Sequence, residues 1–436
     1  MKSKVYSSVE QFKEQNAELK TDLPISDDNS VLCQKVKIGN LELSNRLVCQ
    51  AMEGCDGTSD GRPDELTVRR YERLSKGGAG LIWFEATAVC NEGRANPRQL
   101  YINKKNLDDF KKIVENIKRW GMKENGYEPA VIMQATHSGR YSKPEGKPAP
   151  IIAYNNPIFE KDNPIDKSRI ITDEGLDRVH ESLVHAAGLA KEAGFDGVDI
   201  KCCHRYLNSE LLSAFTREGR YGGSFENRTR LLRESVRDSI SLCGDGFTVT
   251  SRMNVYDGFP YPYGFGVKEG EGITPDFSEA DRLIKELAEL GVKLLDITMG
   301  NPYFNPHVNR PYAAGGYEPP EHPLCGVARM LKGTAKLGKA NPDVSLICSG
   351  LSFLGAAAPG VAAAFIEEGG FSLAGFGRMI FAYPDFAKDL VNGRFDPKKI
   401  CIACSKCTEI MRAGGTPGCI VRDGETYMPI YKKYCK

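Results

Sequence analysis

The sequence predicts an α/β protein in which a closed (β/α)8 TIM barrel is followed by a short cysteine-rich extension. Eight short apolar runs, rich in β-branched residues and bounded by glycine or polar residues, are typical of buried parallel strands. Helix-like patterns lie between these runs, for example over 173–193 and 226–243. Because eight strand–helix units are the number that closes a barrel, the pattern favours a barrel over an open, doubly wound sheet.

The expected strands follow one another along most of the chain. They span 46–51, 80–89, 130–136, 197–200, 247–253, 292–298, 344–349 and 371–375. An open dinucleotide-binding sheet would carry a G-x-G-x-x-G turn after its first strand, and no such turn follows residue 51. The absence favours the barrel. Long irregular loops at 258–272 and 300–323 follow the fifth and sixth strands, where a barrel enzyme carries active-site loops.

The chain is long enough for one large domain with appendages. Its 436 residues, 41% of them hydrophobic, allow a large core and exceed what one compact domain usually contains. We expect three regions. Residues 1–30 form a helix near 8–19 and a polar linker, 31–395 form the barrel, and 396–436 form the extension.

Charge balance and hydropathy narrow the class of protein. With 58 Lys and Arg against 57 Asp and Glu, the net charge of +1 gives no electrostatic argument for nucleic acid or an anionic membrane, so we expect a small-molecule substrate. Residues 1–20 lack the apolar core of a signal peptide, and no stretch approaches the roughly 18 apolar residues of a membrane span. Fourteen cysteines then indicate thiols and metal ligands in a reducing compartment. We expect a soluble cytoplasmic protein, and the sequence predicts no oligomeric state.

The extension contains four cysteines in a C-x2-C-x2-C-x11-C array. They are Cys401, Cys404, Cys407 and Cys419. Three closely spaced thiolates can hold one face of a cubane cluster while a distant fourth closes it, and glycines at 414, 415 and 418 allow tight turns there. A structural zinc site more often pairs two short C-x2-C hooks, so the array favours a 4Fe-4S cluster over zinc.

Glycines and an arginine follow the last two expected strands. Ser349-Gly350 ends the seventh strand, and Gly375-Phe-Gly377-Arg378 ends the eighth. These two loops form the usual phosphate site of a barrel, where backbone N–H groups cradle the phosphate and an arginine neutralises it. A phosphorylated cofactor such as FMN is expected there, although glycine after a strand is also common turn chemistry.

Lys201, His204 and Tyr206 follow the fourth strand, at the catalytic mouth of the predicted barrel. The run that contains them, 196–213, and the run 220–228 resemble the old yellow enzyme family of FMN-dependent ene-reductases. Further matching blocks are 43–48, 77–81, 85–88 and 134–140. Within that family, the cysteine array is similar to the branch that contains 2,4-dienoyl-CoA reductase and trimethylamine dehydrogenase. The resemblance covers roughly residues 31–425.

The resemblance implies a set of contacts to FMN. Gln134 would bond the polar edge of the flavin ring, and Arg252 would lie near its N1–C2 carbonyl end, where an arginine stabilises the anionic reduced flavin. The other implied contacts are backbone around Ala51, Met52 and Ala86 for the ring, and Gly350, Gly377 and Arg378 for the phosphate.

The resemblance also implies the chemistry of an ene-reductase. His204 corresponds to the second of two groups that bond a substrate carbonyl and polarise the conjugated C=C bond. Tyr206 corresponds to the proton donor: flavin N5 delivers hydride to the β-carbon, and the phenol protonates the α-carbon. Outside such a motif, a histidine is more often a core residue and a tyrosine a packing residue.

Two residues depart from the family pattern. Lys201 takes the place of the first histidine of the carbonyl-binding pair, where it would donate to an oxyanion or bind a substrate carboxylate. Glu53 stands where many members place a threonine or cysteine against the flavin. A carboxylate there disfavours reduced flavin unless it is protonated or turned away. Cys55 is the alternative for that place if the loop shifts.

The source of electrons stays open at this stage. Several cluster-bearing relatives continue into FAD- and NAD(P)H-binding domains, whereas this chain ends at Lys436. The expectation is therefore a separate redox partner, a ferredoxin or flavin reductase, that reduces the cluster. Direct hydride transfer from NAD(P)H to FMN is the simpler rival.

Two other functions remain as alternatives. The cysteine spacing equally resembles an amine dehydrogenase of the trimethylamine dehydrogenase type. Lys201 and Glu53 suggest a non-catalytic electron-transfer flavoprotein built on a retired barrel, although the retained Tyr206, His204, Gln134 and Arg252 speak against it. His307 and Arg310, in the long loop after the sixth strand, are candidates for either a substrate pocket or an exposed surface.

Overall fold

The eight predicted strands form a closed parallel barrel in the computed structural model, which describes residues 4–435. Hydrogen bonding joins the strands in the order β10-β3-β4-β5-β6-β7-β8-β9, and the last strand pairs with the first. The barrel predicted from the sequence is confirmed, and closure excludes the open sheet. Residues 1–3 of the predicted N-terminal segment and Lys436 of the predicted extension lie outside the described residues.

Each barrel strand overlaps the apolar run that predicted it. The strands are β3 (Leu47–Cys49), β4 (Leu81–Ala88), β5 (Ala130–Thr136), β6 (Gly197–Ile200), β7 (Thr248–Asn254), β8 (Leu294–Thr298), β9 (Ser345–Cys348) and β10 (Leu373–Phe376). Every residue of β4 and of β5 is buried. Side chains fill the inside of the barrel and helices cover its outside, which is why these runs are apolar on both faces.

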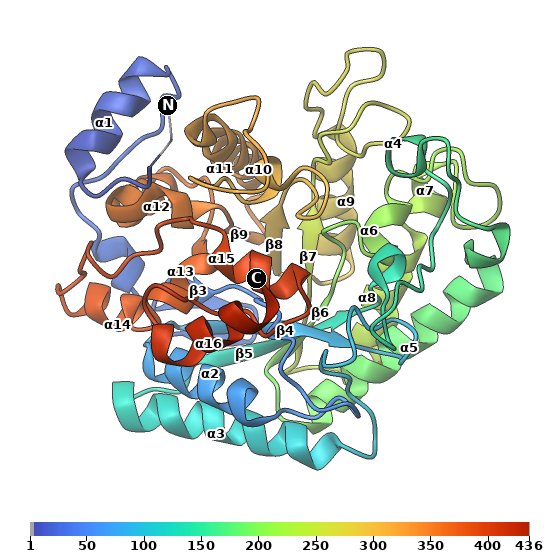
Figure 1. The fold of residues 1–436 in the computed structure, drawn as a ribbon, viewed down its shortest axis with the longest axis horizontal. Coiled ribbons are helices and arrows are strands. Elements are labelled where there is room, and N and C mark those ends of the chain that lie inside the picture. Colours follow the sequence, from blue (N-terminus) through green and yellow to red (C-terminus); the bar gives the residue numbers. More distant parts are fainter. Residues whose placement is uncertain (1–3, 436) are drawn as a thin grey trace.

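Helices alternate with the strands and surround the barrel (Figure 1). The main ones are α2 (Glu65–Lys76), α3 (Leu107–Asn125), α5 (Asp173–Glu192), α8 (Arg230–Cys243), α9 (Ser278–Glu289), α11 (Pro323–Ala340), α12 (Ala358–Glu367) and α14 (Phe386–Val391). In α3, the buried Phe110, Ile113 and Ile117 show the spacing of one helix face. The helix predicted over 226–243 is interrupted at Thr229.

Shorter elements fill the loops. They are α4 (Pro157–Glu160), α6 (Leu207–Leu211), α7 (Phe225–Arg228), α10 (Pro306–Asn309) and α13 (Arg378–Ala382), with the 3-10 helices η1 (Ser30–Cys33), η2 (Gly139–Tyr141), η3 (Lys167–Arg169) and η4 (Leu351–Ala357). Within residues 4–435, no helix combines the length and the apolar character that crossing a membrane requires.

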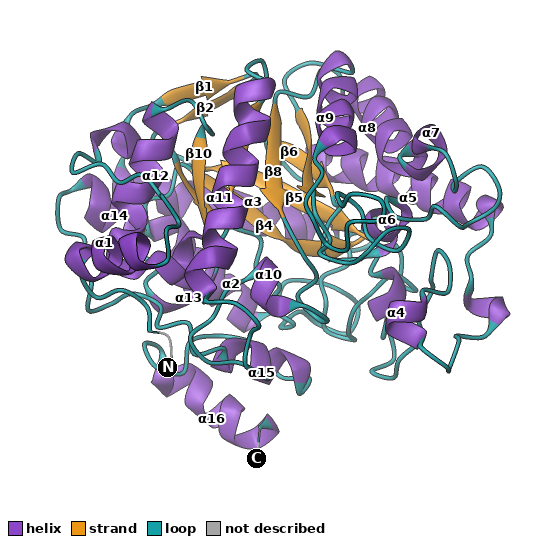
Figure 2. Cartoon of the chain, turned by 90° about the horizontal axis from the view of Figure 1, so that it is seen from above, coloured by secondary structure: helices purple, strands orange, loops and turns teal. Residues whose placement is uncertain are grey.

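A two-stranded hairpin covers the N-terminal end of the barrel. Its antiparallel strands are β1 (Val36–Ile38) and β2 (Leu41–Leu43), and Ile38 and Leu41 share an apolar cluster with Leu81 at the start of β4. Figure 2 shows the hairpin and the C-terminal helices at opposite ends of the barrel. The sequence analysis missed the hairpin because strands of three residues are too short to show a pattern. The hairpin leaves the C-terminal mouth as the open end.

The N-terminal helix α1 (Val9–Glu18) lies outside the barrel and packs on η4. It overlaps the segment expected near 8–19, and the hydroxyl of Ser8 caps it by accepting from the Gln11 backbone N–H. Phe12 is fully buried and packs edge-to-face on Tyr6, with 5.6 Å between the ring centroids. Tyr6 in turn packs edge-to-face on Phe353 of η4, with 6.0 Å between the ring centroids. These aromatic contacts attach the helix to the barrel.

The C-terminal extension crosses the open mouth. Its helices α15 (Lys406–Arg412) and α16 (Gly424–Tyr434) lie in front of the barrel in Figure 1. Asp423, at the start of α16, accepts from Arg69 of α2 at 2.8 and 2.9 Å and also pairs with Arg73. Because bidentate arginine–carboxylate pairs fix orientation as well as distance, these contacts hold the extension over the mouth.

We predict that Phe12→Ala lowers the free energy of unfolding by about 3–5 kcal/mol, the usual cost of removing a buried aromatic ring. Urea unfolding followed by circular dichroism measures the change. The matched control is Glu14→Ala on the exposed face of the same helix, with an expected change within about 0.5 kcal/mol. Equal stability of Phe12→Ala and the parent would show that α1 contributes nothing to the folded barrel.

Candidate active site

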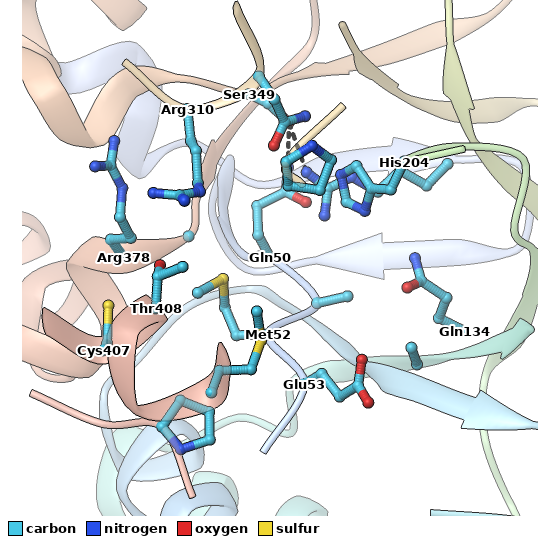
Figure 3. Close-up of a pocket in the computed structure, with 18 of the residues that line it drawn as sticks. Gln50, Met52, Glu53, Gln134, His204, Arg310, Ser349, Arg378, Cys407 and Thr408 are labelled. Carbon is cyan, nitrogen blue, oxygen red and sulfur yellow. Dashed lines mark hydrogen bonds between the residues drawn. The ribbon is translucent and has the colours of Figure 1, made fainter. Parts of the chain in front are cut away.

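All residues predicted to bind a cofactor or act on a substrate line one cavity at the C-terminal mouth, which we call the main cavity (Figure 3). They are Ala51, Met52, Glu53, Ala86, Gln134, Lys201, His204, Tyr206, Arg252, Gly350, Gly377 and Arg378. Parallel strands of a closed barrel all end at the same face, so the loops after them converge there. The structure therefore brings together residues from both ends of the chain.

Asp199, inside the barrel, holds the polar side of the main cavity in place. Its carboxylate is fully buried and accepts from Gln134 Nε2 at 2.6 Å, from Trp83 Nε1 at 2.7 Å and from the Arg252 backbone N–H at 2.7 Å. Burial raises the pKa of Asp199 to about 6. Because Gln134 donates an amide N–H to Asp199, the orientation of its amide is fixed. Figure 3 shows the Gln134 side chain in the main cavity.

Gln50 and Ser349 complete this polar wall, and the sequence analysis did not select them as cofactor-binding residues. Gln50 Nε2 donates to Asp296 at 3.0 Å and to Ser349 at 3.2 Å, while Arg252 pairs with Asp296 at 3.1 Å and donates to Ser349 at 3.2 Å. The carbonyl oxygen of Gln50 is buried without a partner. Their position could have indicated both residues from the sequence, because Gln50 and Ser349 each directly follow a barrel strand.

Two arginines lie at the other end of the main cavity. Arg310 and Arg378 stand beside each other in Figure 3, and each has an Nη1 that is buried without a partner. Burial and the nearby positive charge of Arg378 lower the pKa of Arg310 to about 10. Two buried, positively charged Nη1 groups without a partner favour a bound anion. Arg310 thus lines the cavity, whereas His307 does not and pairs with Tyr317 instead.

Lys201, His204 and Tyr206 converge at the end of the cavity near Gln134. The Lys201 Nζ lies 3.7 Å from the centroid of the Tyr206 ring. Burial, with the positive charges of Arg252 and Lys201, lowers the pKa of His204 well below its usual value, so its imidazole is neutral at pH 7. His204 has φ 65°, a left-handed conformation that is costly for a non-glycine residue and is found mainly at functional sites.

Glu53 turns toward Tyr206 in the structure. The Tyr206 hydroxyl donates to Oε2 at 3.4 Å, and Asn96 donates to Oε1 at 3.0 Å. Glu53 is partly exposed, to cavity space on both sides. Loss of water around its carboxyl raises its pKa, against the opposing positive charge of Lys201 and these hydrogen bonds. Cys55, the alternative to Glu53 for the position beside the flavin, does not line the main cavity.

Tyr303 is a cavity residue that sequence reasoning missed. It follows β8, and its hydroxyl lies 2.9 Å from that of Tyr206. Asn301 accepts a bond from the Tyr303 backbone at 2.9 Å, which shapes the turn that presents the ring. No motif marks Tyr303, because it belongs to a long loop in which a tyrosine has no expected partner.

The four cysteines of the array line a separate, smaller cavity, the cysteine cavity, with Cys407 and Arg378 also lining the main one. Backbone N–H groups of Ala403 and Arg422 donate to Cys401 Sγ at 3.4 Å and Cys419 Sγ at 3.3 Å. Ala403 and Ser405 have φ 50° and 59°, a strained path that wraps the loop around the sulfurs.

The four array sulfurs do not form a tight cluster. Among the described residues, three or more metal-ligand atoms come within 4.8 Å of one another only at Cys90, Glu92 and His137, away from the array. No three of the four array sulfurs are therefore that close. Burial raises the pKa of Cys401 to about 12, so without a positive ion this thiol stays protonated.

Comparisons with known proteins agree with the barrel. A sequence profile of the NADH:flavin oxidoreductase / NADH oxidase family matches residues 32–396. An NADPH dehydrogenase from Geobacillus sp. (strain WCH70) is 30% identical over 276 residues, which cover 62% of this chain and 73% of that protein.

Solved structures are similar over most of this chain. 2-Naphthoyl-CoA reductase, in complex with 2-naphthoyl-CoA, has a TM-score of 0.74 at 21% identity, over 93% of this chain and 58% of that one. Histamine dehydrogenase from Rhizobium sp. 4-9 has a TM-score of 0.68 at 21% identity, over 90% of this chain and 52% of that one. At these identities the likeness shows the fold alone, and this chain spans little more than half of each structure.

We predict that Asp199 makes stability depend on pH in one direction. Its folded pKa of about 6 exceeds the unfolded value of about 3.9, so the native state keeps a proton that the unfolded state loses. Protonated Asp199 therefore adds roughly 2–3 kcal/mol to the free energy of unfolding below about pH 4. This stabilisation is lost as the pH rises through about 6. Unfolding measured across this window should show the loss in the parent and not in Asp199→Asn. A parent that gains stability over Asp199→Asn with rising pH would contradict the assignment.

Proposed function

This chain belongs to the NADH:flavin oxidoreductase / NADH oxidase family, and we propose that it is an FMN-dependent ene-reductase that reduces a C=C bond conjugated to a carbonyl or thioester. Membership confirms the resemblance to the old yellow enzymes and makes the protein a flavin-dependent oxidoreductase. The observation that carries the proposal is the convergence of Lys201, His204 and Tyr206 on the cavity that also contains Gln134 and Arg252.

The main cavity suits FMN at both of its ends. The unpartnered Nη1 atoms of Arg310 and Arg378 suit the phosphate, while the Nη2 of Arg378 donates to the Pro311 carbonyl. Gly350 has φ 92°, a conformation that favours glycine and leaves its backbone uncovered by a side chain. At the other end, Arg252 and the unpartnered Gln50 carbonyl suit the polar edge of the ring. We assign the ring to Ala51, Met52, Ala86, Gln134 and Arg252, and the phosphate to Gly350, Gly377 and Arg378.

Three side chains would activate the substrate. When bound, FMN supplies a hydride from N5 of its ring to the substrate β-carbon. The neutral His204 would donate its N–H to the carbonyl oxygen, and the buried Lys201 ammonium would stabilise the negative charge that develops there. Tyr206 would protonate the α-carbon, since its pKa lies well above the usual value and its hydroxyl keeps its proton until then.

The four cysteines would hold a 4Fe-4S cluster. A tetrahedral zinc site with Zn–S bonds of about 2.3 Å requires sulfurs about 3.8 Å apart, which is closer than the array provides. The larger cubane suits this spacing, and the two N–H···S bonds support thiolate ligands. On this proposal, 396–436 is the cluster-binding extension of an FMN-binding barrel over 31–395, preceded by a helix and linker over 1–30.

A cluster in the cysteine cavity would lie beside the phosphate end of FMN. Arg378 and Cys407 line both cavities, so the two sites share a wall across which single electrons would pass. We propose that NAD(P)H delivers electrons directly, as the family description implies, or that a ferredoxin or flavin reductase delivers them through the cluster. The cytoplasm suits this chemistry, because none of the cysteines in the described part of the chain forms a disulfide.

Amine oxidation is the second candidate, favoured by the fold match with histamine dehydrogenase and by Glu53, a carboxylate able to hold a substrate ammonium. Against it stand Lys201, Arg252 and Arg310, whose positive charges in the same cavity repel a cationic amine. Turnover of tertiary amines with an electron acceptor, in the absence of enone reduction, would select this candidate.

We predict that Tyr206→Phe lowers NADPH-dependent turnover of 2-cyclohexen-1-one about 10²–10⁴-fold, the usual contribution of a general acid. Bleaching of the flavin by NADPH in anaerobic stopped-flow should be unchanged, because the phenol takes no part in that half-reaction. The control is Tyr434→Phe in α16, outside the main cavity. Parent-like enone turnover by Tyr206→Phe would remove the phenol from the mechanism.

We predict that anaerobically purified protein contains about four iron and four sulfide per chain, with flavin bands over a broad brown absorbance. Cys419→Ala should lose the iron and the brown absorbance while keeping the flavin bands. Cys435→Ala, in the same extension but outside the cysteine cavity, is the matched control. Stoichiometric zinc without iron would overturn the cluster assignment.

A further inference from the structure

Glu53 stands between the main cavity and a second, outer cavity. The outer cavity is lined by Glu53, Cys55, Ala95, Asn96, Pro97, Arg98, Tyr141, Lys143, Gly146, Tyr303, Met411, Arg412, Ala413 and Gly414. Its rim carries exposed residues such as Arg98, Lys143 and Arg412, so water reaches it. Three residues line both cavities, and of these only Glu53 and Tyr303 carry a titratable group.

Tyr206 needs a route for protons that its own position does not provide. The side chain is 2% exposed and lines the main cavity but not the outer one. A bound substrate would fill the main cavity and exclude water from it. Once the phenol has given up its proton, burial makes the resulting phenolate costly, because the pKa of Tyr206 is raised well above its usual value. A proton must therefore reach Tyr206 before each new turnover.

We propose that Glu53 carries protons from water in the outer cavity to Tyr206, and so restores the proton donor between turnovers. The inference rests on the proposed ene-reductase function. The O–H bond of Tyr206 breaks as the substrate α-carbon gains a C–H bond. The Glu53 carboxylic acid then gives its proton to the phenolate, and the Glu53 carboxylate takes a proton from water. The net change is one proton moved from solvent to product, with no electrons involved.

The contacts around Glu53 suit this transfer. One carboxylate oxygen, Oε2, faces the Tyr206 hydroxyl at 3.4 Å, while Oε1 is held by Asn96 at 3.0 Å on the side of the outer cavity. The two oxygens therefore point to the two ends of the transfer. Asn96 follows β4 and fixes the carboxyl without supplying a proton of its own.

The charges facing Glu53 balance against one another. The titratable groups around it are Lys201, Tyr206, Tyr303, Cys55 and Asp56. Burial favours the protonated acid most strongly, Lys201 and the hydrogen bonds favour the carboxylate, and Asp56 again favours the acid. The pKa of Glu53 is raised as a result, which moves it toward the pH at which a group can both release and regain a proton.

The neighbours of Tyr206 are poorer donors. Tyr303 bonds its hydroxyl at 2.9 Å, but burial raises the pKa of Tyr303 far above that of a useful acid. Lys201 lies over the face of the ring, 3.7 Å from its centroid, and makes no hydrogen bond with the hydroxyl. Of the two titratable groups that line both cavities, Glu53 contacts the hydroxyl and is the stronger acid, since Tyr303 is a phenol whose pKa burial raises further.

The test compares single and repeated turnovers of the FMN-loaded protein with NADPH and 2-cyclohexen-1-one. In Glu53→Gln, Tyr206 still holds its first proton, so one reduced flavin should be reoxidised by the enone at the parent rate. Steady-state kcat should fall about 10-fold or more, with a larger solvent deuterium isotope effect, because reprotonation becomes limiting. Glu53→Asp should recover part of the loss, and the exposed Glu145→Gln, outside both cavities, should match the parent.

Infrared difference spectroscopy of the same proteins provides a readout that does not depend on turnover. The parent should show a protonated-carboxyl band that shifts in D2O, disappears in Glu53→Gln and moves in Tyr206→Phe, because the two groups share a hydrogen bond. Absence of that band overturns the inference about Glu53 whether or not the protein reduces enones. The infrared result therefore distinguishes failure of this inference from failure of the proposed ene-reductase function.

Three kinetic outcomes also overturn the inference. Parent-like kcat in Glu53→Gln means that protons reach Tyr206 by another route. An equal loss in single and repeated turnovers means that Glu53 only positions Tyr206. Slower flavin bleaching by NADPH means that Glu53 adjusts the flavin potential instead.

Discussion

Closure of the parallel barrel is the constraint on which the rest of the structure depends. Every strand must end at the same face, and the apolar hairpin β1–β2 covers the opposite face. Whatever polar residues follow the strands therefore meet at one mouth, where Asp199 orients Gln134 and the Arg252 backbone. The extension can then complete the site simply by crossing that mouth, where Asp423 anchors it to α2.

Positive charge at both ends of the main cavity is the second organising feature of the site. Arg310 and Arg378 lie at one end of the main cavity, each with an unpartnered Nη1. Lys201 and Arg252 lie at the other end, where Arg252 pairs with Asp296. A molecule with a phosphate and an electron-accepting ring meets a cation at each end, so binding and reduction are both favoured. Arg378 also faces the cysteine cavity, where its positive charge lowers the pKa of Cys401 against the effect of burial and so favours the thiolate.

Glu53 shows how a departure from a family pattern can be accommodated. Next to a flavin, an ionised carboxylate would oppose reduction. Here the side chain bonds Tyr206 and Asn96, and burial raises its pKa, so the negative charge is both displaced and reduced. The unfavourable effect of a carboxylate on reduced flavin, which the sequence predicts for position 53, is thereby weakened. The contacts that weaken it are the same ones that place the carboxyl between the outer cavity and Tyr206.

The sequence by itself determined the order of the eight strands, because buried parallel strands must be apolar on both faces and so stand out along the chain. It also indicated Arg378, since position after a strand implies the mouth of a barrel, and the family resemblance indicated Gln134. It missed Tyr303, Gln50 as a cavity residue and the hairpin β1–β2, whose roles depend on neighbours far away in sequence. Only the tertiary structure decided that Glu53 faces Tyr206 and that Arg310 joins Arg378, because the direction of a loop side chain is set by packing between loops.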